Sequence, residues 1–159
     1  MKYWLMKTEP DQFSFDDLVR APKSTECWDG VRNYQARNLM RDDMSLGDLV
    51  FIYHSRIADP AVVGIAEIVK EAYPDDTALD AKSPYADAKS IEKGESRWLM
   101  VDVKAVKRMS RPVTLSEMRD MEPLSKMALL KRGQRLSIQP VSAAEWKIVS
   151  SLGKPLKIK

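Results

Sequence analysis

Three β-rich runs in the middle of the chain constrain its fold more than any other feature. Residues 49–54 are almost continuously apolar, which is typical of a buried strand. Residues 61–72 and 97–109 are also rich in strand-forming residues, and Gly64 in the first of these marks a bulge or a close approach of another group. Together with an aromatic-rich strand over residues 2–7, these runs predict a sheet.

Capping signals predict short helices around the strands. Ser14 precedes two acids and begins a helix that ends before Pro22. Thr114 and Ser142 each begin a Ser/Thr-x-x-Glu capping box, and the second of these helices ends at Gly153. The pattern therefore indicates helices that begin at three places outside the central strands.

The remaining segments are less regular. Residues 74–96 contain two prolines and a glycine without a sustained period, so they predict a long loop with at most a short turn of helix. Loops of this length within a compact domain are often functional. Residues 124–131 predict a further helix, and residues 136–139 predict a short strand that Pro140 ends.

The order of these elements determines the fold class. It shows no βαβ repetition and no internal repeat. It favours one mixed α+β domain over residues 1–159, with a curved, largely antiparallel sheet that resembles a small barrel. Gly47 and Gly64 are the expected points at which the strands bend.

Composition excludes several kinds of site. With one cysteine, Cys27, and one histidine, His54, the chain has no internal disulfide and too few soft ligands for structural zinc. Acid pairs such as Asp42 and Asp43 are typical of solvated turns, so no metal and no other cofactor is expected. No apolar run approaches the ~20 residues of a membrane span, and residues 3–6 are too short for a signal peptide. We therefore expect a cytoplasmic protein without membrane contact.

Charge is distributed unevenly along the chain. Residues 1–103 carry 13 Lys and Arg against 19 Asp and Glu, whereas residues 104–159 carry 13 against 4. One interpretation is a basic face that meets phosphate groups. The other is a basic segment that folds against the acidic part of the chain and neutralises it. The sequence does not decide between them.

The segment from Trp28 to Asn38 has an unusual composition for a helix start. Asn and Tyr are middling helix formers, and the segment also carries Arg32 and Arg37, which favours a binding site over a purely structural helix. Gly30 is expected to lie just before the helix and to leave its first N–H groups open to a ligand. The alternative is an ordinary surface helix with a buried Trp at its start.

Five motifs resemble those of one known family. They are Lys7-Thr-Glu-Pro10, Trp28 to Asn38, Tyr53-His-Ser55, Ser83-Pro-Tyr85, and Arg135-Leu-Ser137 followed by Pro140. Together they resemble the EVE domain, a member of the PUA-like superfamily related to the YTH domains. The similarity extends from Tyr3 to about Trp146, and its first two motifs are the most specific.

The resemblance implies a PUA-like pseudobarrel with flanking helices. It also implies a pocket for an extruded, chemically modified base, with modified cytosine in DNA as the favoured ligand and a modified RNA base as the alternative. It maps one wall of an aromatic cage onto Trp28. The base-binding residues expected on this basis are Lys7, Thr8, Glu9, Trp28, Asn33, Tyr34, Tyr53, His54, Ser55 and Tyr85.

The chemistry of these side chains agrees with that expectation. The indole of Trp28 can stack on a base of any identity. Asn33, Thr8, Ser55 and Glu9 carry donors and acceptors for a Watson–Crick edge, and Glu9 as an acceptor suits an exocyclic amino group such as that of cytosine. The residues expected to contact phosphate are Arg32, Arg37, Arg132 and Arg135. The expected partner is therefore nucleic acid.

Two other functions compete with this one. Cys27 and His54 could form a nucleophile and base, with Ser55 as another candidate nucleophile. However, the chain has no Gly-x-Ser-x-Gly elbow and no Gly-rich phosphate loop, and adjacent strand residues point to opposite faces, so catalysis is not expected. An RNA-binding adaptor is the second alternative. Each aromatic or basic residue also has a plainer interpretation, as core for Trp4, Trp98 and Trp146 and as wet surface for the arginines.

Overall fold

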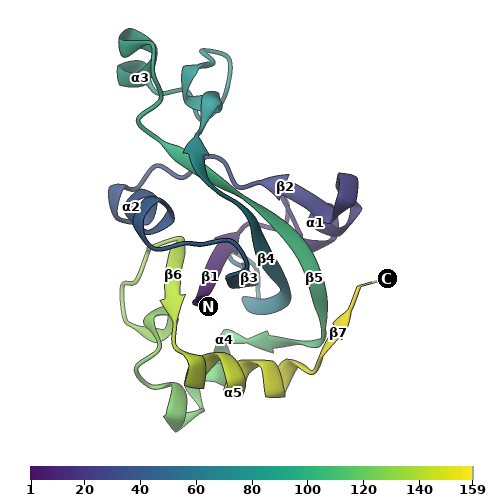
Figure 1. Ribbon diagram of the computed structural model, residues 1–159. Helices are drawn as coiled ribbons and strands as arrows, with labels where there is room; N and C mark the ends of the chain where they lie inside the picture. The colour runs from purple at the N-terminus through teal and green to yellow at the C-terminus, as the bar shows by residue number, and fades with distance from the viewer. Residues whose placement is uncertain (159) are drawn as a thin grey trace.

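A single curved sheet organises the molecule. The computed structural model describes residues 1–158, and its seven strands follow the order β2-β5-β4-β3-β1-β6, with β7 paired to β5. Figure 1 shows the long strands β4 and β5 bending around the sheet. Only β1 and β3 pair in parallel within this described part, and the other strand pairs are antiparallel. The strands are β1 (Tyr3–Thr8), β2 (Thr25–Cys27), β3 (Leu49–His54), β4 (Ala61–Pro74), β5 (Leu99–Thr114), β6 (Ile138–Val141) and β7 (Pro155–Lys157).

Short helices cover both faces of the sheet, so the predicted mixed α+β class is confirmed. The helices are α1 (Phe15–Arg20), α2 (Tyr34–Asp42), α3 (Ala88–Lys93), α4 (Leu115–Arg119) and α5 (Ala143–Gly153). Ser142 forms the predicted capping box, and Ser14, predicted as an N-cap, forms a complete capping box as well. Thr114 caps the backbone N–H of Glu117, but the Glu117 carboxylate pairs with Arg111 instead of turning back to the cap.

Three local predictions are wrong. Residues 124–131 do not form one helix, because Met127 is extended and separates two 3-10 turns, Glu122–Leu124 and Ala128–Leu130. The apolar spacing there reflects side chains packed separately into the core. Strand β6 continues through Pro140, which is tolerated because β6 is an edge strand and pairs only with β1. Gly47 lies in the turn before β3, with φ +87°, and does not bend a strand.

Gly64 acts as the sequence predicts. The register of β4 shifts beside it against both neighbouring strands. A Cβ at this position would lie 2.3 Å from the ring of Phe15, so glycine is required for α1 to approach the sheet. This contact packs α1 beside the end of β3, where the candidate site lies.

The core has one apolar cluster on each face of the sheet. Trp4 and Met6 face α1 and α2, whereas Leu5 and Phe51 face α5, as the two-residue period of a strand requires. The Phe51 and Trp146 rings stack with centroids 3.7 Å apart. Trp4 and Trp146 are therefore core residues, as predicted.

The predicted long loop contains short helices and projects from the sheet. Residues 75–97, here called the arm, connect β4 to β5 and include a 3-10 turn, Asp76–Leu79, and α3. Figure 1 shows the arm extending beyond the ends of β4 and β5, on the side of the molecule away from α5. Among the described residues, no helix is long and apolar enough to cross a membrane.

Candidate functional site

A cavity of about 950 Å³ lies where several chain segments end at one edge of the sheet. The parallel pairing of β1 and β3 brings their carboxyl ends together, with Thr8 opposite His54 and the Ser55 N–H donating to Thr8 O at 3.0 Å. The segment after β2 closes a second side, because Trp28 N–H donates to Val101 O on β5 at 2.7 Å. The arm and the segment before β6 complete the wall. The walls of the cavity therefore come from segments that are distant in sequence and that the fold brings together.

Eight of the residues predicted for the site line this cavity. The indole of Trp28 is 8% exposed and meets the Phe13 ring edge to face, with centroids 6.1 Å apart. It supplies a flat apolar wall, and the contact with Phe13, which also lines the cavity, helps to hold the ring in place. The eight residues are Lys7, Thr8, Glu9, Trp28, Arg32, Ser55, Tyr85 and Arg135.

Some polar groups at the cavity are already engaged. The Thr8 hydroxyl donates to Phe13 O at 2.7 Å. The Glu9 carboxylate lies 3.2 Å from Nε of Arg56, a residue that the sequence analysis missed. Lys7 is half-buried beside them, and this burial lowers the pKa of its amine. The predicted hydrogen-bonding role of Glu9 therefore competes with an ion pair.

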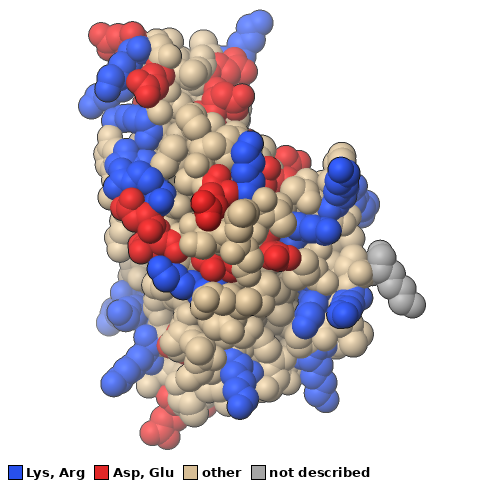
Figure 2. All heavy atoms as spheres, in the orientation of Figure 1, with Lys and Arg blue, Asp and Glu red and all other residues tan. Residues whose placement is uncertain are grey.

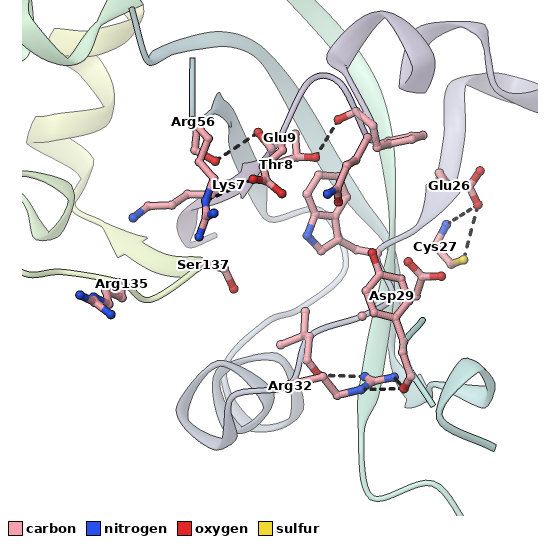
Figure 3. Close-up of a pocket in the computed structure, with 17 residues that line it drawn as sticks. Lys7, Thr8, Glu9, Glu26, Cys27, Asp29, Arg32, Arg56, Arg135 and Ser137 are labelled. Atoms are coloured by element: carbon pink, nitrogen blue, oxygen red, sulfur yellow. Dashed lines mark hydrogen bonds and ion pairs between the residues drawn. The ribbon is translucent and has the colours of Figure 1, made fainter. Parts of the chain in front are cut away.

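The two ends of the cavity differ in charge. Figure 3 shows Lys7, Arg56 and Arg135 at one end, together with Glu9, and Glu26 and Asp29 at the other. Burial, and then the negative charge of Asp75, raise the pKa of Asp29. The sequence analysis did not select Asp29, although it directly follows Trp28 in the segment that drew attention.

Cys27 lies at the acidic end as an unreactive thiol. Burial first, and then its hydrogen bond to Glu26, raise the pKa of Cys27 to about 12. The thiolate required of a nucleophile is thus disfavoured at neutral pH.

Four of the predicted base-binding residues do not line the cavity. The Asn33 side chain caps α2 by accepting the N–H of Ala36 at 3.0 Å, and Tyr53 is buried in the core beside α5. Tyr34 is 49% exposed and stacks on Trp98, with ring centroids 4.8 Å apart. His54 Nε2 accepts the N–H of Phe15 at 3.0 Å, and burial lowers the pKa of the imidazole, which favours this neutral acceptor. Asn33, Tyr53 and His54 therefore serve the helix start and the core, and Tyr34 packs against Trp98.

The expected open N–H groups at Gly30 are a further correction. Helix α2 begins at Tyr34, and the Gly30 N–H donates to Asp75 Oδ2 at 2.9 Å. Gly30 has φ +79°, and the ring of Tyr85 rests so close that an added Cβ would lie 2.6 Å from it. Gly30 therefore allows the arm to pack against the cavity wall, and its N–H is not available to bind an anion.

Two of the four predicted phosphate contacts are used inside the protein. Arg32 donates to Asp75 Oδ2 at 3.0 Å and to Tyr85 O at 2.8 Å, so it ties the arm to the cavity wall. Arg37 donates to Asn38 Oδ1 at 2.9 Å and to Arg97 O at 3.2 Å. Arg132 and Arg135 are exposed, and only Arg135 of these two lines the cavity.

Some basic residues in the last third of the chain are paired with acids inside the protein, and others are exposed on the surface. Arg108 pairs with Asp16 of the acidic part and Arg111 pairs with Glu117 within its own third. In Figure 2, most of the charged residues on the lower part of the surface, where Figure 1 places β6 and α5, are nevertheless Lys and Arg. Within residues 1–158, no group of three or more His, Cys, Asp and Glu side chains could hold a metal ion.

Comparison with known families agrees with this geometry. The sequence model described as "EVE domain" matches residues 2–152. The chain belongs to the EVE domain family. The predicted resemblance is thereby confirmed over nearly the whole sequence.

The relatives of this EVE domain include proteins with solved structures. Thymocyte nuclear protein 1 from mouse and from human are each 44% identical, over 94% of this chain and 73% of the relative. The crystal structure of the human protein in complex with DNA containing 5-methylcytosine has a TM-score of 0.90 at 43% identity, and the match covers 97% of this chain and 98% of that one. A hypothetical protein from Leishmania major has a TM-score of 0.89 at 49% identity, with 97% and 95% covered.

Proposed function

We propose that this EVE domain is a non-catalytic reader, which holds a modified base, turned out of a nucleic acid strand, in the cavity beside Trp28. The observation that carries the proposal is the cavity itself, which combines an indole wall with polar groups and a cationic rim. The complex of the human relative with DNA containing 5-methylcytosine supports that base as the favoured ligand. A modified base in RNA is the alternative that the same experiment tests.

The free-energy cost of turning out a base is similar in size to the free energy that its contacts in the cavity can provide. Extrusion of a base from its stack costs a few kcal/mol. Stacking on an aromatic side chain returns about 1–3 kcal/mol per base, and contacts of Lys and Arg with phosphate add affinity that depends on salt. Lys7, Arg56 and Arg135 lie together at one end of the cavity, where the backbone that carries the base can meet them (Figure 3).

The chemistry of the cavity supports binding without catalysis. The raised pKa of Cys27 keeps its thiol protonated. His54, the general base considered from the sequence, accepts the N–H of Phe15 and does not line the cavity. The nucleophile and base considered from the sequence are therefore not assembled.

The proposal is tested with two variants that change the aromatic side chain at position 28 in steps. Trp28→Phe keeps a ring for stacking, whereas Trp28→Leu keeps only apolar bulk. With a fluorescent oligonucleotide that contains one 5-methylcytosine, we expect affinity to fall in the order Trp, Phe, Leu. The total loss for Trp28→Leu is about 5- to 150-fold, from the ~1–3 kcal/mol of base stacking. Anisotropy titrations in DNA and in RNA, at two salt concentrations, measure it.

Tyr34→Ala is the matched control. Tyr34 is also aromatic and comes from the same sequence segment, but it lies outside the cavity and is half exposed. We expect its removal to leave affinity within about twofold, which is far less than the stacking term. Equal binding by wild type, Trp28→Phe and Trp28→Leu, all shown to be folded by circular dichroism, would refute the pocket.

A further inference from the structure

We infer that Asp29 selects the base, by accepting a hydrogen bond from the exocyclic amino group of a cytosine-type base held against Trp28. This inference rests on the proposed function and specifies the chemical class of the base. It replaces Glu9, the acceptor expected from the sequence, with a residue at the other end of the cavity.

The three acidic residues that line the cavity differ in their partners. The Glu9 carboxylate pairs with Arg56 at 3.2 Å. Glu26 Oε1 accepts the Cys27 N–H at 3.1 Å and lies 3.4 Å from its Sγ. In the described part of the chain, Asp29 has no ion pair and no hydrogen bond from another side chain, and its carboxyl accepts only its own backbone N–H. Asp29 therefore has the largest unused capacity to accept a hydrogen bond.

The surroundings of Asp29 make a donor from a ligand favourable. Its carboxyl is half-buried, and Asp75 and Glu26 add negative charge, while Arg32 adds a positive charge that is mainly engaged with Asp75. When a ligand fills the cavity and displaces water from this half-buried carboxyl, a donor on the ligand offsets the free-energy cost of that lost hydration. A base that brings an N–H to this position is stabilised, and a base that brings an oxygen is repelled.

This chemistry separates two bases of almost the same shape. 5-Methylcytosine and thymine both carry a methyl group at C5 and stack alike, but C4 carries an amino donor in the first and a carbonyl acceptor in the second. Sites that bind a substrate through buried polar groups discriminate strongly against analogues that leave those groups unpaired. The cavity is therefore expected to take amino-bearing bases and to reject thymine and uracil.

Single-stranded oligonucleotides that differ only in one 5-methylcytosine or one thymine provide the test, because no base pair has to open. We expect wild type to bind the 5-methylcytosine strand at least tenfold more tightly. Asp29→Asn keeps the shape but adds an amide donor that suits the thymine carbonyl. We expect it to reduce the ratio to below about threefold, both by weaker binding of 5-methylcytosine and by tighter binding of thymine. Asp42→Asn, at an exposed acid of α2, is the control and keeps the wild-type ratio.

The outcomes separate this inference from the proposed function. A wild-type ratio near one overturns the inference, whether or not any variant folds. A folded Asp29→Asn variant that keeps the wild-type ratio also overturns it, as does a ratio that collapses in Glu9→Gln instead. If Trp28→Leu still weakens both strands in those cases, the base pocket stands. If Trp28→Leu changes neither affinity, the proposed function fails as well.

Discussion

Two groups of aromatic and charged residues in this protein look alike in sequence and differ in structure. The first, here called the arm clamp, consists of Tyr34, Asp87, Arg97 and Trp98. In it, Arg97 Nε donates to Asp87 Oδ2 at 2.7 Å, and Trp98 Nε1 donates to the same oxygen at 3.0 Å. The Tyr34 hydroxyl also pairs with Arg97, whose hydrogen bonds keep the pKa of Asp87 well below its usual range. The arm clamp therefore satisfies its polar groups internally.

The cavity around Trp28 has the same residue types, but more of its polar groups are left without partners inside the described part of the protein. Its indole lies in a wall beside open space, Arg135 is exposed at the rim, and within residues 1–158 Asp29 receives no hydrogen bond from another side chain. Unused hydrogen-bonding capacity, rather than an aromatic and basic composition, thus distinguishes a binding site from a structural cluster. The following predictions test that distinction.

The largest expected effect is on Arg32, which lines the cavity but has its guanidinium bonded to the arm. Arg32→Ala leaves the buried carboxylate of Asp75 without its ion pair. Because hydrogen bonds to charged groups contribute about 1.5–3 kcal/mol, we expect the free energy of unfolding to fall by that amount. Urea denaturation measures it, with Arg41→Ala, at an exposed arginine of α2, as the control.

The same variant tests the phosphate role that the sequence suggested for Arg32. We expect the slope of log affinity against log salt to stay unchanged, since the guanidinium is already used inside the protein. If Arg32→Ala lowered this salt slope and left the free energy of unfolding unchanged, Arg32 would be a phosphate contact. The distinction between internally bonded residues and residues free to bind a ligand would then fail.

Arg135 is predicted to behave in the opposite way, with a smaller effect. Arg135→Ala removes an exposed cation from the cavity rim, so we expect a similar, modest loss of affinity for every oligonucleotide and an unchanged midpoint of unfolding. One lost phosphate contact lowers the salt slope by about 0.9 for duplex DNA or about 0.7 for a single strand.

Arg111→Ala is the matched variant for Arg135. Arg111 also comes from the basic last third of the chain, but its guanidinium pairs with Glu117. Its removal is expected to leave the salt slope at the wild-type value. A loss confined to one base in Arg135→Ala would instead assign Arg135 to base recognition.

Local signals in the sequence predict much of the fold. The apolar run that forms β3 and the capping residues Ser14 and Ser142 act within a few residues, so their elements are predicted with nearly correct bounds. Pro140 was wrongly expected to end a strand, because the edge position that tolerates it is set by the order of strands across the whole sheet.

Prediction of the site is limited in the same way, because contacts between distant segments decide which residues line it. The strand-end residues Lys7 to Glu9 and Ser55 were expected together, and the parallel pairing of β1 and β3 brings them together. The resemblance assigned Tyr34 and His54 to the pocket, and the sequence does not reveal that they bond elsewhere, because their partners, Arg97 and the Phe15 N–H, are distant in sequence. Asp29 was missed because a carboxylate that bonds only to its own backbone has no signature in a single sequence.

The central claim is that the cavity at Trp28 holds an extruded base, and a crystal structure with a duplex that contains one 5-methylcytosine tests it most directly. We predict the base on the Trp28 indole, with its amino group toward Asp29 and the neighbouring phosphates toward Lys7 and Arg135. A structure in which the DNA is ordered, the base remains stacked in the duplex, and contacts are made only by the surface around β6 and α5 would contradict the account.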